Sequence, residues 1–142
     1  MELTDGAEAV GMARTRRDGN DAVIITWGTM VGPSLAAAEA LSAEQLDVGV
    51  LDLRWLNPLA EKAIVDAVTA AKGKVLIVHE AVRTGGFAAE IAMRIRELVP
   101  EMDVRISRLT TPDVRMPSSP VLQKALLPNA QTIAEAVRAI GG

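Results

Sequence analysis

Residues 75–91 read Val-Leu-Ile-Val-His-Glu-Ala-Val-Arg-Thr-Gly-Gly-Phe-Ala-Ala-Glu-Ile and are the most informative stretch of the chain. The apolar run over residues 75–78 is typical of a buried strand. Three polar side chains follow it: His79, Glu80 and Arg83. A glycine pair then opens a helical pattern: Gly85 and Gly86. A strand, a charged loop and a helix N-terminus in this order are typical of the edge of an open α/β sheet, where such folds place their binding surfaces.

The alternation of strands and helices continues along the chain. Apolar runs predict strands over residues 22–27, 48–53, 74–78 and 104–109. Apolar residues three or four positions apart predict helices over residues 30–46, 59–71, 86–99, 121–126 and 129–140. Asn129 is a plausible N-cap of the last helix. The pattern predicts a three-layer α/β/α fold with a mostly parallel, open sheet.

The first 21 residues differ in character from the rest. They are polar, carry the arginines Arg14, Arg16 and Arg17, and end in the turn-forming residues 18–21. We expect residues 1–21 to be a linker or an N-terminal extension, and residues 22–142 to form one domain. The arginines could attract an anionic partner, but short basic runs of this kind are more often solvated.

Composition narrows the function classes. Apolar residues make up 49% and charged residues 23% of the 142, as in ordinary globular proteins. The net charge of −3 and the absence of a basic stripe with aromatic residues argue against nucleic acid as a partner. Without cysteine the chain has no disulfides and no thiolate metal site. The sequence shows neither a signal peptide nor a run of about 20 apolar residues, so we expect a cytoplasmic protein that does not cross a membrane.

The charged stretch after residue 78 allows two interpretations. His79 could transfer protons, because its ordinary pKa of about 6.5 suits that role. Alternatively it is hydrogen-bonded in a subunit interface, which we favour because no second catalytic group is evidently placed beside it. Glu80 and Arg83 could hold a substrate, but an interface salt bridge is favoured.

The glycine pair and its neighbours allow two interpretations as well. Gly85 and Gly86 could present N–H groups to a phosphate, yet the stretch lacks both G-x-G-x-x-G and a P-loop lysine. Close packing of a helix on the sheet is therefore favoured. Phe87 is expected to anchor an interface or the core. Asp52, at the end of another strand, is expected to order the loop that leads to Pro58.

Five short motifs resemble, in one order, a known family: the C-terminal domain of the beta subunit of thiamine-diphosphate-dependent 2-oxo acid dehydrogenases. This is the pyruvate and branched-chain type, within the transketolase C-terminal domain superfamily. The motifs are Trp27-Gly28-Thr29-Met30-Val31, residues 50–59, His79-Glu80-Ala81 with residues 83–87, Thr111-Pro112-Asp113 and Leu127-Pro128. The likeness starts at Val10 and covers residues 10–142. Arg115 and Ser118-Ser119 depart from the family, which more often has proline and an aromatic residue there.

The resemblance implies that the whole enzyme oxidatively decarboxylates a 2-oxo acid and transfers the acyl group to lipoyl. Thiamine diphosphate and magnesium would lie between the alpha subunit and the N-terminal domain of the beta subunit. This chain would then hold no catalytic, cofactor-binding or metal-binding residue and would be inactive alone. Its implied partners are the alpha subunit, a second beta subunit and that N-terminal domain, and in isolation a homodimer is expected.

Two surfaces are expected to meet these partners. The interface candidates are His79, Glu80, Arg83, Gly85, Gly86 and Phe87. The acyltransferase's basic subunit-binding domain would dock on acidic groups, for which the candidates are Glu101, Asp103 and the carboxylate of Gly142. Two alternatives stay open: a separate C-terminal subunit of a split transketolase-like enzyme, and a non-catalytic module that binds a small anion or acts as a scaffold.

Overall fold

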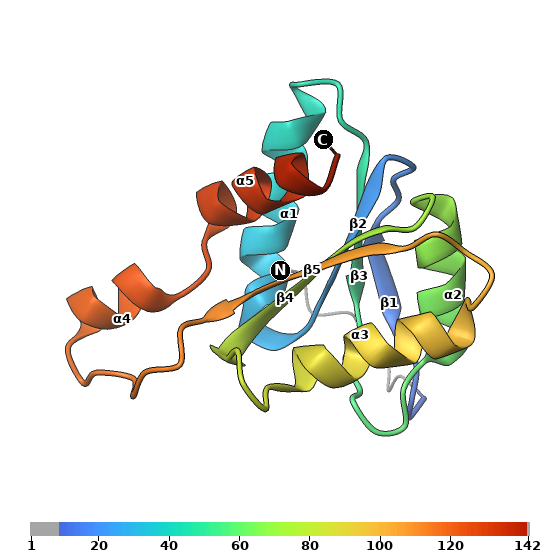
Figure 1. Ribbon diagram of the computed structural model, residues 1–142. Helices are drawn as coiled ribbons and strands as arrows, with labels where there is room; N and C mark the ends of the chain where they lie inside the picture. The colour runs from blue at the N-terminus through green and yellow to red at the C-terminus, as the bar shows by residue number, and fades with distance from the viewer. Residues whose placement is uncertain (1–8, 142) are drawn as a thin grey trace.

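The computed structural model describes residues 9–141 and shows a five-stranded sheet between two layers of helices (Figure 1). The strands are β1 (Arg14–Arg17), β2 (Ala22–Thr26), β3 (Val48–Asp52), β4 (Lys74–Val82) and β5 (Arg105–Thr111). Their order in the sheet is β1-β3-β2-β4-β5, and β1 alone runs antiparallel to its neighbour. The predicted three-layer fold with a mostly parallel sheet is therefore confirmed.

The helices divide between the two faces of the sheet (Figure 1). A short 3₁₀ turn, η1 (Gly28–Met30), leads into α1 (Val31–Ser42), and the others are α2 (Glu61–Ala70), α3 (Phe87–Leu98), α4 (Pro120–Leu126) and α5 (Ala130–Gly141). Helices α1 and α5 cover one face, whereas α2 and α3 cover the other. All five predicted helices are confirmed, with ends that differ by at most four residues.

Two apolar cores hold these layers together. Neighbouring residues of the central strand β2 serve opposite cores: Ile24 packs with α1 and α5, and Ile25 with α2 and α3. Neither side chain has any exposed surface. Because both faces of this strand are covered, its sequence is a continuous apolar run, and the periodicity of a one-sided strand is absent. Asn129 caps α5 as predicted, since its Oδ1 accepts the backbone N–H of Thr132 at 3.0 Å.

The linker prediction is wrong for residues 14–17, which form the edge strand β1. Arg16 pairs with the carboxylate of Asp52 at 2.8 Å, and Arg17 donates to the carbonyl oxygen of Val48 at 2.6 Å. Asp52 is only 4% exposed, and it also accepts the backbone N–H of Arg54, which orders the following loop as predicted. The strand escaped prediction because polar contacts with β3, and no alternation of apolar residues, hold it in place.

Strand β4 extends four residues beyond its predicted end. His79 and Glu80 were expected in a charged loop, but they lie within the strand. His79 is level with Thr110 of β5 and Val82 with Thr111, and the register shifts between the two pairs. The neighbouring strand therefore determines where β4 ends, which the end of the apolar run does not reveal.

Helix α4 stands apart from both cores. None of its residues is buried, and it projects from the body on the segment that connects β5 to α5 (Figure 1). Over residues 9–141, no helix has the length and apolar character needed to cross a membrane.

Candidate interface at the carboxyl edge of the sheet

Three ring side chains meet where the central strands end. Ile25 of β2 is level with Ile77 of β4, so Trp27 and His79, each two residues further on, reach the same place at the carboxyl edge. The ring centroids of Trp27 and His79 lie 4.3 Å apart, and Phe87 meets Trp27 edge-on at 6.3 Å. The sheet register thus builds an aromatic cluster, defined here as Trp27, His79 and Phe87, from three separate segments.

The imidazole of His79 is held in an unusual environment. Its Nδ1 atom is buried and has no hydrogen-bond partner among the described residues. A Cβ atom added to Gly86 would lie 3.8 Å from this nitrogen and only 2.2 Å from the carbonyl oxygen of Val82. Gly86 therefore lets the start of α3 approach the end of β4 closely, as expected from the packing interpretation. Burial lowers the pKa of His79, and the carboxylate of Glu80 opposes this change.

This lowered pKa makes the stability of the protein depend on pH. Between the pKa of folded His79 and its ordinary value of 6.5, the unfolded chain binds more protons. We therefore expect the contribution of His79 to the free energy of unfolding to be complete above pH 6.5 and to decrease as the pH drops below 6.5. Urea unfolding across this range measures the effect, and the chain's single histidine makes the assignment direct.

The matched variant is His79→Phe, which should remove this slope. Carboxylates with lowered pKa values, such as Glu44 hydrogen-bonded to Arg138, lose their stabilisation only below pH 4.5 and do not interfere. An identical slope in the variant would show that another group is responsible.

Glu80 and Arg83 do not pair with each other in the described chain. Glu80 accepts the hydroxyl of Thr29, which precedes α1. The guanidinium of Arg83 instead donates to the carbonyl oxygen of Arg108 on β5 at 3.2 Å. The sequence analysis placed both residues in one loop. In the structure Glu80 lies within β4, whereas Arg83 follows the end of this strand. Their role in an interface salt bridge stays a prediction.

One polar contact at this edge was not predicted. Asp113 accepts both the backbone N–H of Thr84 at 2.8 Å and its hydroxyl at 2.5 Å. These hydrogen bonds lower the pKa of Asp113. They tie the segment after β5 to the loop before α3. The available signal was the Thr111-Pro112-Asp113 motif, which the family resemblance includes without assigning a contact to Asp113.

An open hollow of about 850 Å³ adjoins the aromatic cluster. Its lining comes from the loop before α2 and from the first turns of α3: Leu56, Asn57, Pro58, Leu59, Glu61, Gly85, Gly86, Phe87, Ala89, Glu90 and Arg94. Arg94 is paired with Glu61. The hollow thus combines an apolar wall with a charge pair, a composition that fits a protein partner.

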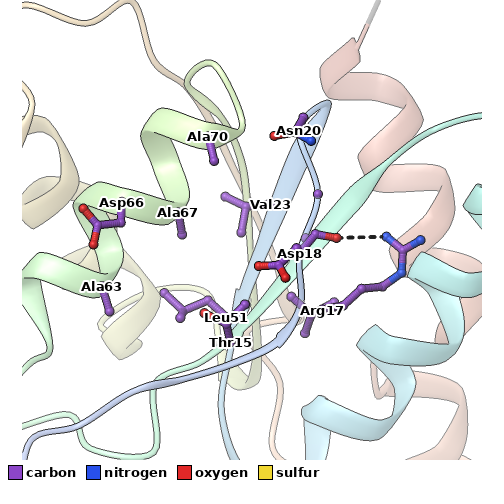
Figure 2. A pocket seen from close by; sticks show the side chains of 13 residues that line it. Thr15, Arg17, Asp18, Asn20, Val23, Leu51, Ala63, Asp66, Ala67 and Ala70 are labelled. Atoms are coloured by element: carbon purple, nitrogen blue, oxygen red, sulfur yellow. Dashed lines mark hydrogen bonds between the residues drawn. The ribbon is translucent and has the colours of Figure 1, made fainter.

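A second hollow, of about 420 Å³, lies beside α2 (Figure 2). Ala63, Ala67 and Ala70 of α2 line it together with Val23 and Leu51 of the sheet. These small alanine side chains leave the space between helix and sheet unfilled. Of the residues that the sequence analysis considered as site candidates, Arg17 lies there.

The two docking candidates within the described residues lie elsewhere. Glu101 and Asp103 are exposed in the turn between α3 and β5, at the opposite edge of the sheet from the aromatic cluster. Gly142 lies outside the described residues. Within residues 9–141, no three histidine, cysteine, aspartate or glutamate side chains gather to hold a metal ion.

Comparisons with known proteins agree with this fold. The family described as "Transketolase, C-terminal domain" matches residues 11–133. The chain is 36% identical to the beta subunit of 2-oxoisovalerate dehydrogenase from Bacillus subtilis over 131 residues, covering 91% of this chain and 40% of that protein. It is 30% identical to the beta subunit of the pyruvate dehydrogenase E1 component from Rhizobium meliloti over 140 residues, covering 98% of this chain and 30% of that protein.

A solved structure described as "Split gene transketolase, inactive beta4 tetramer" has the same fold, with a TM-score of 0.82 and 23% identity. The match covers 96% of this chain and 44% of that one. The chain thus spans less than half the length of each of these three proteins. The match of the family model to most of the chain shows that it belongs to the transketolase C-terminal domain family, and that it is homologous to the beta subunits of pyruvate and branched-chain 2-oxo acid dehydrogenases.

Proposed function

We propose that this domain is the partner-binding C-terminal part of the beta subunit of a 2-oxo acid dehydrogenase. The observation that carries the proposal is the character of the carboxyl edge. There the single histidine packs against the ring of Trp27, beside a hollow that combines an apolar wall with a charge pair. The buried Nδ1 of this histidine has no hydrogen-bond partner among the described residues. Sequence identities of 30% and 36% to beta subunits of this class support the choice of enzyme.

The whole enzyme would oxidatively decarboxylate a 2-oxo acid and pass the acyl group to lipoyl. The thiamine diphosphate with its magnesium would be held by the alpha subunit and the N-terminal beta domain, as the family resemblance implies. The contribution of this chain is then to assemble and orient the subunits.

Exposed apolar side chains on the connecting segment support such assembly. Four lie on the segment that carries α4, and a fifth lies at the end of β4: Val114, Met116, Val121, Leu122 and Val82. They range from 40% to 78% exposed. Water contact with apolar surface of this kind is unfavourable, and a partner subunit would remove it. We propose that the alpha subunit or a second beta subunit covers this segment, and that the isolated chain forms a homodimer.

The test is assembly with the partner subunits. We expect Phe87→Ala to weaken co-assembly with the alpha subunit and the N-terminal beta domain at least tenfold, which is about 1.4 kcal/mol. Phe87 is half-buried, so the variant loses part of a surface that an interface would complete. Sedimentation with the cognate subunits measures the loss of assembly. Decarboxylase activity in the mixture of the wild-type chain with these subunits would identify the enzyme class.

Val65→Ala is the matched control, because Val65 is also half-buried but lies on α2, outside the aromatic cluster. It should leave assembly unchanged. Equal assembly by Phe87→Ala and wild type, with both folded by circular dichroism, would exclude the aromatic cluster as an interface.

The acyltransferase is proposed to dock at the opposite edge. Exposed carboxylates at Glu101 and Asp103 would attract its basic subunit-binding domain, and added salt should weaken the complex because such charges are screened over about 8 Å. The double variant Glu101→Gln, Asp103→Asn should weaken it further in a surface-plasmon titration. Salt-insensitive binding, unchanged in the variant, would show that docking occurs elsewhere.

A split transketolase-like subunit is the second candidate. The observation in favour of this candidate is the TM-score of 0.82 to a structure described as a split-gene transketolase. The same reconstituted mixture separates the two functions. Reduction of lipoyl groups on a 2-oxo acid indicates the dehydrogenase, whereas transfer of a two-carbon unit between sugar phosphates indicates the transketolase.

A further inference from the structure

The sheet has an uncovered groove along its outer strand. Strand β5 ends the sheet order on one side, so its outer backbone groups face no further strand among the described residues. Between β5 and α3 lies a groove of about 270 Å³, called the β5 groove here. It is lined by Ala89, Ala92, Met93, Arg96 and Arg108. Met93 is 55% exposed, which gives the groove an accessible apolar wall.

The β5 groove carries positive charge that no carboxylate of the described residues neutralises by an ion pair. Arg96 donates to the carbonyl oxygen of Val104 at 3.4 Å, and Arg108 to that of Arg83 at 3.3 Å. Within residues 9–141, neither Arg96 nor Arg108 forms an ion pair with a carboxylate. Glu97, on the same helix, is paired with Arg94. A protein of net charge −3 therefore presents guanidinium groups along one strand edge.

We propose that the β5 groove binds an extended acidic polypeptide segment, which adds to the sheet as a strand beside β5. Its backbone would pair with the outer N–H and C=O groups of β5 other than the carbonyl oxygen of Arg108, which accepts Arg83. Its carboxylates would pair with the arginines. Guanidinium groups bind carboxylates with two parallel hydrogen bonds, which gives such pairs directional strength.

The spacing of the arginines specifies the sequence of the segment. Arg96 contacts the backbone at Val104, and Arg108 lies four residues further along the chain, a rise of about 13 Å in a strand. Side chains four residues apart in an extended peptide point to the same side. The segment should therefore carry carboxylates at positions i and i+4, with an apolar side chain at i+2 facing Met93.

Two other occupants fit this edge less well. A second copy paired through β5 would bring Arg108 close to Arg108 of its partner when the pairing is centred there, and like charges on facing strands are destabilising. Nucleic acid would use the guanidinium groups but would leave the outer backbone groups of β5 unpaired and Met93 exposed. The unpaired strand edge therefore favours a polypeptide.

The test uses two labelled peptides of identical composition and the 142-residue chain. The first, Thr-Glu-Thr-Val-Thr-Glu-Thr, has its carboxylates four positions apart. The second, Thr-Glu-Thr-Val-Glu-Thr-Thr, has them three apart and on opposite sides. Fluorescence anisotropy should show at least tenfold tighter binding of the first peptide. Hydrogen exchange should slow at Ile106 and Arg108 when it binds, because the N–H groups of these two residues face away from β4.

Variants separate specific pairing from net charge. Arg96→Gln with Arg108→Gln should weaken binding of the first peptide at least tenfold. Lys62→Gln with Arg138→Gln removes two positive charges from other surfaces and should leave binding unchanged. Undetectable binding, equal binding of the two peptides, equal weakening by both variant pairs, or tighter binding of a single-stranded oligonucleotide would each overturn the proposal.

Discussion

Replacing Ile91 by alanine should lower the free energy of unfolding by about 2–5 kcal/mol. Ile91 lies on α3 with none of its surface exposed, in the core shared by α2, α3 and the sheet. Alanine would leave a cavity that the neighbouring side chains fill only in part. Urea unfolding followed by circular dichroism measures the loss.

The control for this variant is Met93→Ala on the same helix. Met93 is 55% exposed, so its truncation should cost no more than about 0.5 kcal/mol. Equal losses for the two variants would mean that α3 does not pack on the sheet through the face described here.

Replacing Gly86 by alanine should destabilise the protein by about 3 kcal/mol, the upper end of the range for overpacking. The new Cβ would lie 2.2 Å from the carbonyl oxygen of Val82, so the start of α3 must move away from β4. Because Phe87 and His79 flank this contact, the movement should also change the near-ultraviolet circular dichroism of Trp27.

Gly85→Ala provides the comparison. Its φ of +72° disfavours alanine, but no atom lies within 4 Å of the added Cβ, so only the backbone cost of about 1 kcal/mol is expected. The Trp27 signal should stay as in the wild type. If Gly85→Ala proved the more damaging change, backbone strain would outweigh the close approach at Gly86.

Much of the layer architecture was predictable because its causes are local or follow from burial. The run Ala22–Thr26 contains only residues that suit a strand covered on both faces, and all five are buried. The N-cap at Asn129 depends on a side chain three residues from its partner, so short-range chemistry was sufficient. The predicted helix over residues 121–126 formed although α4 buries nothing.

The candidate interface was only partly predictable. His79, Gly86 and Phe87 were singled out from one stretch of sequence. The contacts of His79 and Phe87 with Trp27, about 50 to 60 residues earlier, depend on the register between β2 and β4. The link between Thr84 and Asp113 likewise joins loops that follow neighbouring strands. Such contacts follow from strand order, which periodicity does not encode.

The sequence by itself determined the alternation of strands and helices and the family, because apolar spacing and short motifs are properties of neighbouring residues. Only the tertiary structure decided that Arg14–Arg17 forms a strand and that β4 continues to Val82. Both depend on hydrogen bonds to other strands. The arginines at the β5 groove also came together only through packing, since Arg96 and Arg108 belong to a helix and a strand whose relative placement no local pattern specifies.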